Sequence, residues 1–304
     1  MKYCDLRPAI AAYREGRNVM QTLRETLGET ANTPQIIEIA YDLQAGGYID
    51  HVRANRELWR AYTSELAGVL RDHIAAGDRV LEAGTGEMTT LVGVANACYA
   101  GISRHYAADI SWSRIAKGRA FAAAEMRADL ASAMSSFVGD LLRLPLRDHS
   151  IDVVWTSHAL EPNAGREQAA LAELFRVARK RVVLFEPSYE DNSAAGRARM
   201  DALGYIRGLP EAIAAQGGRL EEKRPIAAIS NPLNPTYAYI VTPPGGASRN
   251  DDEWACPATR LPMQKCGDCY WSEASRLAYP IIGSIPVLRE ESAVYATSLA
   301  DAGS

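Results

Sequence analysis

The segment Val80–Glu87 constrains the fold of this chain more than any other. It reads Val-Leu-Glu-Ala-Gly-Thr-Gly-Glu, a short apolar strand that ends in the carboxylate of Glu82 and is followed by two closely spaced glycines. Glycine has no Cβ and takes dihedral angles that other residues avoid, so a ligand can approach the backbone of such a turn. The pattern indicates a nucleotide-like ligand, although Met88 stands where the dinucleotide fingerprint has its third glycine.

Strand-like and helix-like segments alternate after this turn. Residues Arg104–Asp109 form a candidate second strand that ends in a carboxylate, and Ile110–Leu130 continue as an amphipathic helix opened by Ser111. Two further apolar runs, 137–140 and 151–156, also end at polar residues. The alternation predicts a parallel sheet with its ligand at the carboxyl ends of the strands, where an acid can accept both hydroxyls of a ribose.

In this order the segments resemble the class I S-adenosylmethionine-dependent methyltransferases, especially the small-molecule branch. Residues 82–86 resemble the glycine-rich first motif, Asp109 the ribose-binding acid, and Gly139-Asp140-Leu141 the loop that contacts adenine. The whole stretch Phe137–Pro187 is similar to the middle section of that family. The resemblance implies S-adenosylmethionine as cofactor, bound by Glu82, Gly84, Thr85, Gly86, Asp109, Ile110, Asp140 and Leu141.

Two positions depart from the family pattern. Met88 replaces the third glycine, and Ala178–Arg181 replace the Pro-Gly-Gly turn that usually precedes the fifth strand. Neither position has to touch the methyl donor. S-adenosylmethionine has no pyrophosphate to seat on a helix N-terminus, so the missing glycine argues less against a methyltransferase than against a dinucleotide enzyme.

The chain divides into three predicted regions. Residues 1–75 carry apolar side chains at helical spacing and are expected to form a helical cap; residues 76–243 form the α/β, Rossmann-like methyltransferase core; and residues 250–296 form a small C-terminal β domain. Within these regions we expect helices over Pro8–Leu27, Thr33–Leu43 and Val52–Ile74, broken at Gly28 and Gly46-Gly47, and final strands within Gly218–Ile229 and Tyr237–Val241.

The C-terminal region resembles the Trm112-like β domain, which is found free-standing or attached to methyltransferases. The resemblance lies in Trp254–Pro257 and in Tyr279–Glu290, which contains Tyr-Pro-Ile and Ile-Pro-Val-Leu. The zinc-bearing relatives use two Cys-x-x-Cys pairs, and of those four positions only Cys256 is a cysteine here, beside Thr259, Ser272 and Ser275. Cys266 and Cys269 form a separate pair at an expected hairpin tip. We expect no metal, but a shifted site of three thiolates stays open.

Methyl transfer needs the acceptor aligned with the methyl group, and a base where the acceptor is a hydroxyl or a protonated amine. His158, at the tip of the fourth strand, is the candidate base, because imidazole titrates near neutral pH; the alternative is that it only lines the donor pocket. Candidate substrate contacts are Glu161, Glu186, Tyr189, Asn231 and Asn234 on neighbouring loops. From the cap, Gln44 and Tyr48 are candidates for contact with the donor's carboxylate, unless their segment is a simple turn between helices.

Composition bounds the remaining choices. The net charge is −4, the isoelectric point is near 5.8, and no long Lys/Arg run occurs, which makes a nucleic acid substrate unlikely on charge grounds. The N-terminus lacks a signal-peptide layout, no run reaches membrane-span length, and the five cysteines do not form a secreted disulfide framework. We therefore expect a cytoplasmic protein without a membrane segment, and its oligomeric state stays open.

The sequence favours methyl transfer to an oxygen or nitrogen of a small polar molecule, such as a sugar or a secondary metabolite. One alternative is a methyltransferase that acts on tRNA or protein, with the Trm112-like tail as a fused activator. The other is a non-catalytic protein that binds S-adenosylmethionine or serves as a scaffold. The acceptor itself cannot be named from one chain, because acceptor pockets are assembled from loops.

Overall fold

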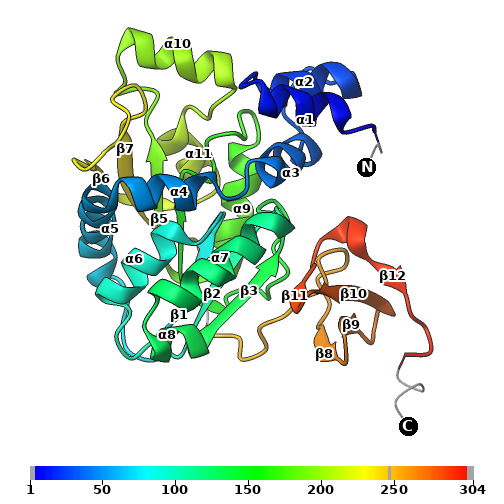
Figure 1. Ribbon diagram of the computed structural model, residues 1–304. Coiled ribbons are helices and arrows are strands. Elements are labelled where there is room, and N and C mark those ends of the chain that lie inside the picture. The colour runs from blue at the N-terminus through cyan, green and yellow to red at the C-terminus, as the bar shows by residue number, and fades with distance from the viewer. Residues whose placement is uncertain (1–3, 246–247, 300–304) are drawn as a thin grey trace.

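The computed structural model describes residues 4–245 and 248–299, which form a seven-stranded sheet with helices on its faces and a small second sheet (Figure 1). The strand order is β3-β2-β1-β4-β5-β7-β6. Strand β7 runs antiparallel to both of its neighbours, and the other pairings are parallel. The strands are β1 Arg79–Ala83, β2 Arg104–Asp109, β3 Met134–Val138, β4 Ile151–Ser157, β5 Ala178–Pro187, β6 Arg219–Pro225 and β7 Thr236–Thr242.

Two hydrophobic layers cover the sheet. On one face, apolar residues of α5, α6 and α7 pack with Val80, Val153 and Val183. On the other, α9 and α11 pack with Leu81, Val154 and Val182. The alternation of successive strand residues between the two faces is what a sheet buried on both sides requires. The helices are α4 Gly47–Ala54, α5 Arg56–Arg71, α6 Thr89–Cys98, α7 Trp112–Glu125, α8 Ala128–Ala133, α9 Glu167–Val177, α10 Ala194–Leu203 and α11 Leu209–Ala215.

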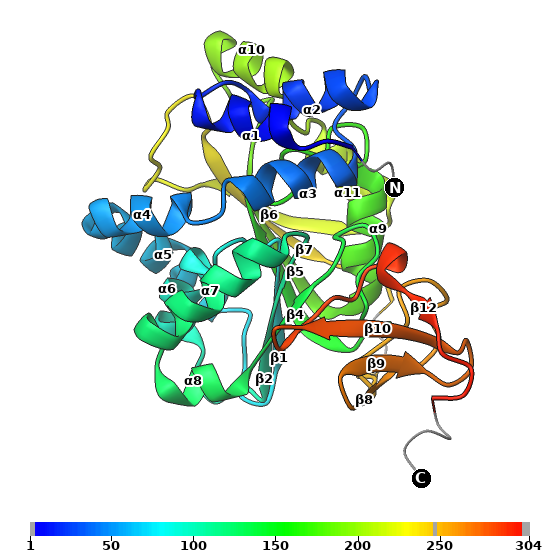
Figure 2. The same cartoon turned by 45° about the vertical axis from the view of Figure 1, so that its right-hand side comes forward.

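The N-terminal helices are shorter and more numerous than predicted. The run Pro8–Leu27 is divided into α1 Arg7–Arg14 and α2 Val19–Leu27, because the chain turns at Gly16 with φ of +68°. Helix α3 spans Pro34–Leu43, close to its predicted range. The predicted helix Val52–Ile74 is two helices, α4 and α5, separated at Asn55, whose φ of −129° is not helical. In Figures 1 and 2, α1 and α2 lie beside α10.

The predicted helix after β2 begins as expected but ends early. The Ser111 hydroxyl accepts a hydrogen bond from the Arg114 amide and caps α7. The chain then leaves the helix at Met126, and α8 follows as a separate short helix. Strand β6 is also shorter than predicted: it ends at Pro225, and the amides of Ala227 and Ala228 donate to Glu65 of α5 rather than to the sheet.

The connection from β3 to β4 contains no helix. Residues 139–150 pass beneath β2 and β1 as turns and loops, where a parallel crossover ordinarily carries a helix. The C-terminal tail covers this face instead. The ring of Trp254 meets Tyr106 and Phe137 edge-on, with centroids 6.0 Å and 5.3 Å away, and buried residues of the tail belong to the same apolar cluster as β1 and β4.

The tail is an antiparallel sheet beside β3, on the side of the molecule opposite α5 in both views (Figures 1 and 2). Val138 of β3 forms a parallel bridge with Val287, and the Leu288 amide donates to the Val138 carbonyl at 2.8 Å. Cys266 and Cys269 pair across the hairpin of β8 and β9, the tip position predicted for them. The strands are β8 Gln264–Cys266, β9 Cys269–Ser272, β10 Leu277–Ile282, β11 Ile285–Pro286 and β12 Val294–Tyr295, and a short 3₁₀ helix spans Glu290–Ser292.

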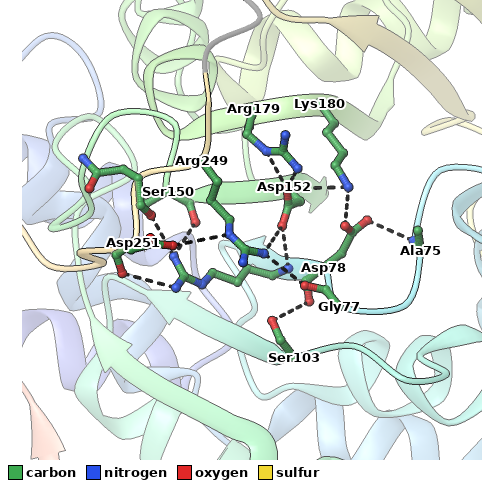
Figure 3. A network of polar contacts seen from close by, with 12 residues as sticks. Ala75, Gly77, Asp78, Ser103, Ser150, Asp152, Arg179, Lys180, Arg249 and Asp251 are labelled. Carbon is green, nitrogen blue, oxygen red and sulfur yellow. Dashed lines mark hydrogen bonds and ion pairs between the residues drawn. The ribbon is translucent and has the colours of Figure 1, made fainter.

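A charged network lies at the amino ends of the central strands β1, β4 and β5 (Figure 3). Asp152 is fully buried and accepts from the Arg79 amide at 2.9 Å and from Arg179 Nε at 2.7 Å. Lys180 pairs with Asp78, and Arg249 of the linker donates to the Gly77 carbonyl at 3.1 Å. Burial raises the pKa of Asp152, but the hydrogen bonds and cations outweigh it, and the net pKa is lowered. The basic residues that replace the Pro-Gly-Gly turn therefore neutralise two buried carboxylates.

Candidate functional site

The glycine turn after β1 is held against the tip of β2. The Gly84 and Thr85 amides donate to the Ala108 carbonyl at 2.8 Å and 2.9 Å. Gly84 has φ of +77°, and a Cβ at this position would lie 2.2 Å from the Ala159 Cβ. Glycine is required here on both counts, because a side chain would be strained and would collide with the loop after β4.

Met88 occupies the backbone conformation that a third glycine would adopt. Its φ is +57°, in the left-handed region, and its side chain is fully buried. A Cβ at Gly118 would lie 2.8 Å from Met88 Cγ, so the methionine packs where α6 and α7 cross closely. The left-handed conformation costs a non-glycine residue roughly 1–2 kcal/mol, and the packing of the buried side chain offsets this cost.

Three carboxylates line the cavity at the tips of β1, β2 and β3. Glu82 accepts from the Thr85 hydroxyl at 2.5 Å. Asp109 accepts from the Gly86 amide and the Ser111 amide, each at 2.9 Å. Asp140 accepts from the Leu142 amide at 2.8 Å. Burial is the main cause that raises the pKa of all three. Each carboxylate keeps lone pairs for a further hydrogen-bond donor.

These residues share one cavity of about 410 Å³. The structure brings together in its lining the predicted residues Glu82, Gly84, Thr85, Gly86, Asp109, Ile110, Asp140, Leu141, Tyr48, His158, Glu161, Asn231 and Asn234. It does not bring Gln44, Glu186 or Tyr189 into that lining.

The cap reaches the cavity through α3 and α4. Glu87, the last residue of the glycine segment, accepts from the Gly46 and Ile49 amides, both at 2.9 Å, and so caps the start of α4. Tyr48 then lies within the lining, whereas Gln44 ends α3 outside it. Of the two candidates from the cap, only Tyr48 is therefore carried into the proposed donor site.

His158 lies in a compact polar cluster at the tip of β4. Its Nδ1 is 3.0 Å from Glu161 Oε2, and its Nε2 is 2.9 Å from the Thr236 hydroxyl. Asn234 Nδ2 donates to the same Glu161 oxygen at 3.1 Å. Burial, the largest single influence, lowers the pKa of His158, but the charge and hydrogen bond of Glu161 together outweigh it, so the pKa is raised.

Glu186 and Tyr189, two of the predicted substrate contacts, lie outside the cavity lining. Glu186 is fully buried, and its Oε1 accepts from the Thr156 hydroxyl and from the amides of Ala159 and Leu160. Burial raises its pKa to about 7. Through Oε1 the carboxyl group shapes the turn that carries His158, whereas Oε2 is buried without a hydrogen-bond partner. Tyr189 donates its hydroxyl to Asp201 at 3.0 Å on the exposed side of α10.

Sequence reasoning missed several residues of the lining. Tyr62 of α5 approaches Ser157 with 3.0 Å between the two hydroxyl oxygens. Tyr41 of α3, Arg114 of α7, and Arg199 and Tyr205 at α10 also line the cavity. No local motif marks these residues, because packing of separate helices over the sheet edge brings them together.

The cysteines of the tail are not gathered into a metal site. Within the described ranges 4–245 and 248–299, no group of three or more Cys, His, Asp or Glu side chains could hold an ion. Cys256 is buried with its sulfur 3.1 Å from the Tyr279 hydroxyl. Cys266 and Cys269 remain at the hairpin tip. The structure thus does not form the three-thiolate arrangement that the spacing left open.

Comparison with known proteins agrees with this geometry. Residues 81–185, from β1 to β5, match the family model described as "Methyltransferase domain". The chain is an S-adenosylmethionine-dependent methyltransferase with the class I fold. Among curated proteins, none matches the chain.

Several solved structures share the fold at low sequence identity. A chain from the Haloferax volcanii complex between the Trm112 methyltransferase activator and a protein described as a methyltransferase has a TM-score of 0.53 at 20% identity, covering 67% of this chain and 98% of that one. Magnesium protoporphyrin IX methyltransferase from Synechocystis PCC 6803, solved with bound S-adenosylhomocysteine, gives 0.53 at 14% identity over 69% and 99% of the two chains.

The [4+2]-cyclase SpnF is also similar, with a TM-score of 0.52 at 15% identity over 71% of this chain and 98% of that chain. A methyltransferase-like fold therefore does not by itself fix the acceptor or its chemistry.

The longest helix, α5, has 16 residues. Among the residues that the structure describes, no helix has the length and apolar character needed to cross a membrane.

The cavity of this methyltransferase fits its cofactor. Arg114 is 5% exposed, its Nε donates to the Tyr41 carbonyl at 3.0 Å, and its Nη2 is buried without a hydrogen-bond partner. Its guanidinium lies over the Tyr41 and Tyr48 rings, 4.2 Å and 5.0 Å from the centroids, and Nη1 would be 3.5 Å from a Cβ at Gly86. A buried guanidinium nitrogen beside the glycine turn suits the donor's carboxylate, while Asp109 suits its ribose.

Proposed function

We propose that this methyltransferase transfers a methyl group to an oxygen or nitrogen of a small polar molecule, with His158 as the base. The observation that carries the proposal is the cluster of His158, Glu161 and Asn234. It lines the same cavity as the three carboxylates assigned to the methyl donor. Helices α3 and α4 contribute Tyr41 and Tyr48 to the lining. A cavity of about 410 Å³ that is lined by both the cap and the core favours a small acceptor over a macromolecular one.

The cofactor supplies an activated methyl group on a sulfonium, so the residues of the chain need only hold the acceptor in line and remove a proton. Glu161 orients the His158 ring through Nδ1 and stabilises its cationic form. The other ring nitrogen, Nε2, is within hydrogen-bond distance of the Thr236 hydroxyl. We propose that this hydroxyl either gives way to the acceptor or passes the proton to Nε2.

The remaining site roles are part of the same proposal. The donor would be held by Glu82, Gly84, Thr85, Gly86, Asp109, Ile110, Asp140 and Leu141, with Arg114 and Tyr48 at its amino acid end. The acceptor would contact Glu161, Asn231 and Asn234. The cap over residues 1–75, the core over 76–243 and a Trm112-like domain over 250–296 remain the proposed division of the chain, and a cytoplasmic location remains an expectation.

A second candidate function follows from the tail. It extends β3 through the bridge of Val138 and Val287, and one structural neighbour comes from a complex with the Trm112 activator. A fused activator would fit a methyltransferase that acts on tRNA or protein. This candidate predicts tRNA affinity that falls steeply with salt. A non-catalytic binding role is the third hypothesis, and it predicts cofactor binding without turnover.

The test is transfer of labelled methyl from S-adenosylmethionine to a metabolite extract divided by an ultrafilter that retains tRNA and protein. We expect label in the filtrate's small molecules and a loss of about 100-fold in rate with His158→Ala. Label only in the retained fraction would favour the macromolecular candidate. Binding of S-adenosylhomocysteine without label in either fraction would favour the non-catalytic role.

A further inference from the structure

The acceptor end of the cavity contains a guanidinium that no carboxylate neutralises. Arg199 of α10 lines the cavity, and its Nη1 is buried without a hydrogen-bond partner. Within the described part of the chain, no ion pair joins it to an Asp or Glu; its neighbour is the Tyr205 ring, whose centroid is 5.5 Å from Arg199 Cζ. A charge removed from water is costly unless it is paired, so an unpaired guanidinium nitrogen in a ligand cavity indicates an anionic ligand.

Other arginines of comparable burial do have such partners. Arg176 and Arg260 both pair with Glu173, at 2.7 Å and 2.6 Å. Arg179 pairs with Asp152 in the charged network at the amino ends of the central strands. Arg199 differs from these arginines, and it lies in the cavity, where an anionic ligand can supply the missing negative charge.

A second unpaired atom belongs to another residue of the same cavity lining. Asn234 Nδ2 donates to Glu161, which fixes the orientation of the amide, and Oδ1 is buried without a partner. Asn234 Nδ2 is also 3.4 Å from His158 Nδ1. The position of Arg199 is close enough to His158 to lower the pKa of the imidazole. One unpaired donor, one unpaired acceptor and the proposed base therefore face the same end of the cavity.

Resting on the proposed methyl transfer, we propose that the acceptor is a small organic anion, whose carboxylate or phosphate pairs with Arg199 while its hydroxyl or amine donates to Asn234 Oδ1. Guanidinium groups bind both kinds of anion through paired N–H groups. The group held by Asn234 then lies beside His158. An amine can donate a second hydrogen to His158, whereas a hydroxyl must turn its one hydrogen from Asn234 Oδ1 to His158 before the proton is removed. The Tyr41 and Tyr205 rings in the lining suit a flat or apolar body between these two groups.

Three probes of similar shape test the anion site in protein saturated with S-adenosylhomocysteine: benzoate, phenyl phosphate and the neutral benzamide. By calorimetry we expect at least one anion to bind about tenfold or more tightly than benzamide. Arg199→Met should remove this preference, and Arg199→Lys should keep part of it. Arg197→Met is the matched control on the same helix, since Arg197 donates to the Asn192 carbonyl and lies outside the lining.

Comparison of benzoate with phenyl phosphate decides between a carboxylate and a phosphate acceptor. Equal binding of all three probes, failure of both anions to bind, or unchanged anion binding in Arg199→Met would overturn the inference. An Arg197→Met variant as defective as Arg199→Met would also count against it, because the loss would then reflect the helix rather than the guanidinium.

Turnover separates this inference from the proposed function. Treatment of the metabolite extract with an anion-exchange resin should remove the methyl acceptor, and the salt eluate should restore labelled product. Full incorporation in the resin-treated extract would overturn the anionic acceptor while leaving methyl transfer intact. Selective binding of anions without product in any fraction would count against methyl transfer and support the anion site.

Discussion

At the scale of single residues, the donor half of the site could be predicted and the acceptor half only in part. Glu82, Gly84, Asp109 and Asp140 lie at strand ends within short motifs, so local sequence places them. Arg199, Thr236 and Tyr62 lie in segments far apart in the chain and meet only through packing. Glu186 and Tyr189 lie at and just after the end of β5, much as the site residues lie at other strand ends. The direction of each side chain decides its role, and the sequence does not show that direction.

The pairing of His158 with Glu161 predicts a pKa change. Because the folded-state pKa of His158 is raised by Glu161, Glu161→Gln should lower it. The stabilisation from the protonated imidazole is present below the unfolded pKa and is lost as pH rises through the folded pKa. Titration of the histidine ring signals by NMR measures the change, and the acid limb of the rate profile should move to lower pH. Glu167→Gln, a change in the first turn of α9 outside the cavity lining, should leave the titration unchanged; an unchanged or higher pKa in Glu161→Gln would refute the pairing.

Arg114 makes a prediction about the cofactor's amino acid end. Arg114→Met should weaken binding of S-adenosylhomocysteine by about tenfold or more, because a charge-assisted hydrogen bond to the carboxylate is lost. It should leave binding of 5′-methylthioadenosine, which lacks that carboxylate, nearly unchanged. Calorimetric titration of both ligands into both proteins gives the comparison. Equal losses for the two ligands would show that Arg114 supports the cavity rather than the carboxylate.

At the scale of elements, strands were easier to predict than helix ends. Buried apolar runs that end in polar residues marked β1, β2 and β4 closely. The breaks at Gly16 and Asn55 were missed because each is a single residue within a continuous helical pattern. Residues Ala178–Arg181, which replace the usual Pro-Gly-Gly turn, have a structural reason outside the motif. Arg179 and Lys180 neutralise the carboxylates of Asp152 on β4 and Asp78 before β1.

Glu87 links the donor turn to the cap, which predicts local opening when it is removed. Glu87→Ala should speed hydrogen exchange at the Gly46 and Ile49 amides by about tenfold or more, because both lose a charge-assisted acceptor. S-adenosylhomocysteine should also bind more weakly, since α4 carries Tyr48. Exchange followed by NMR measures the effect. Glu57→Ala, an exposed change in the first turn of α5, is the control; equal exchange at these amides in the Glu87 variant and wild type would contradict the link.

At the scale of the whole molecule, the tail packs closely on the core. The sequence indicated a small β domain behind a linker. The structure instead uses the tail to cover the face of the sheet beneath residues 139–150, and Arg260 of the tail pairs with Glu173 of α9. No pattern in the tail alone could show this, because the need for it arises from a missing helix more than a hundred residues earlier.

This packing predicts that the core and the tail unfold together. Trp254→Ala should lower the free energy of unfolding by about 3 kcal/mol, since it removes a ring packed between two strands of the core and the tail. Denaturant melts followed by fluorescence and by circular dichroism should show one coincident transition in both proteins. Tyr295→Ala, at a tail side chain that is 83% exposed, should change stability by less than about 0.5 kcal/mol. Separate transitions for the tail and the core would show two independent units.

The central claim is that the glycine turn, Asp109 and Asp140 hold a methyl donor, and calorimetric titration with S-adenosylhomocysteine tests it most directly. We expect one molecule bound per chain, with affinity reduced about tenfold or more by Asp109→Ala, which removes the acceptor for the ribose hydroxyls. Arg119→Met, a change on α7 outside the cavity lining, should leave the affinity unchanged. Absence of binding to the unaltered chain, or equal binding by Asp109→Ala, would contradict the claim.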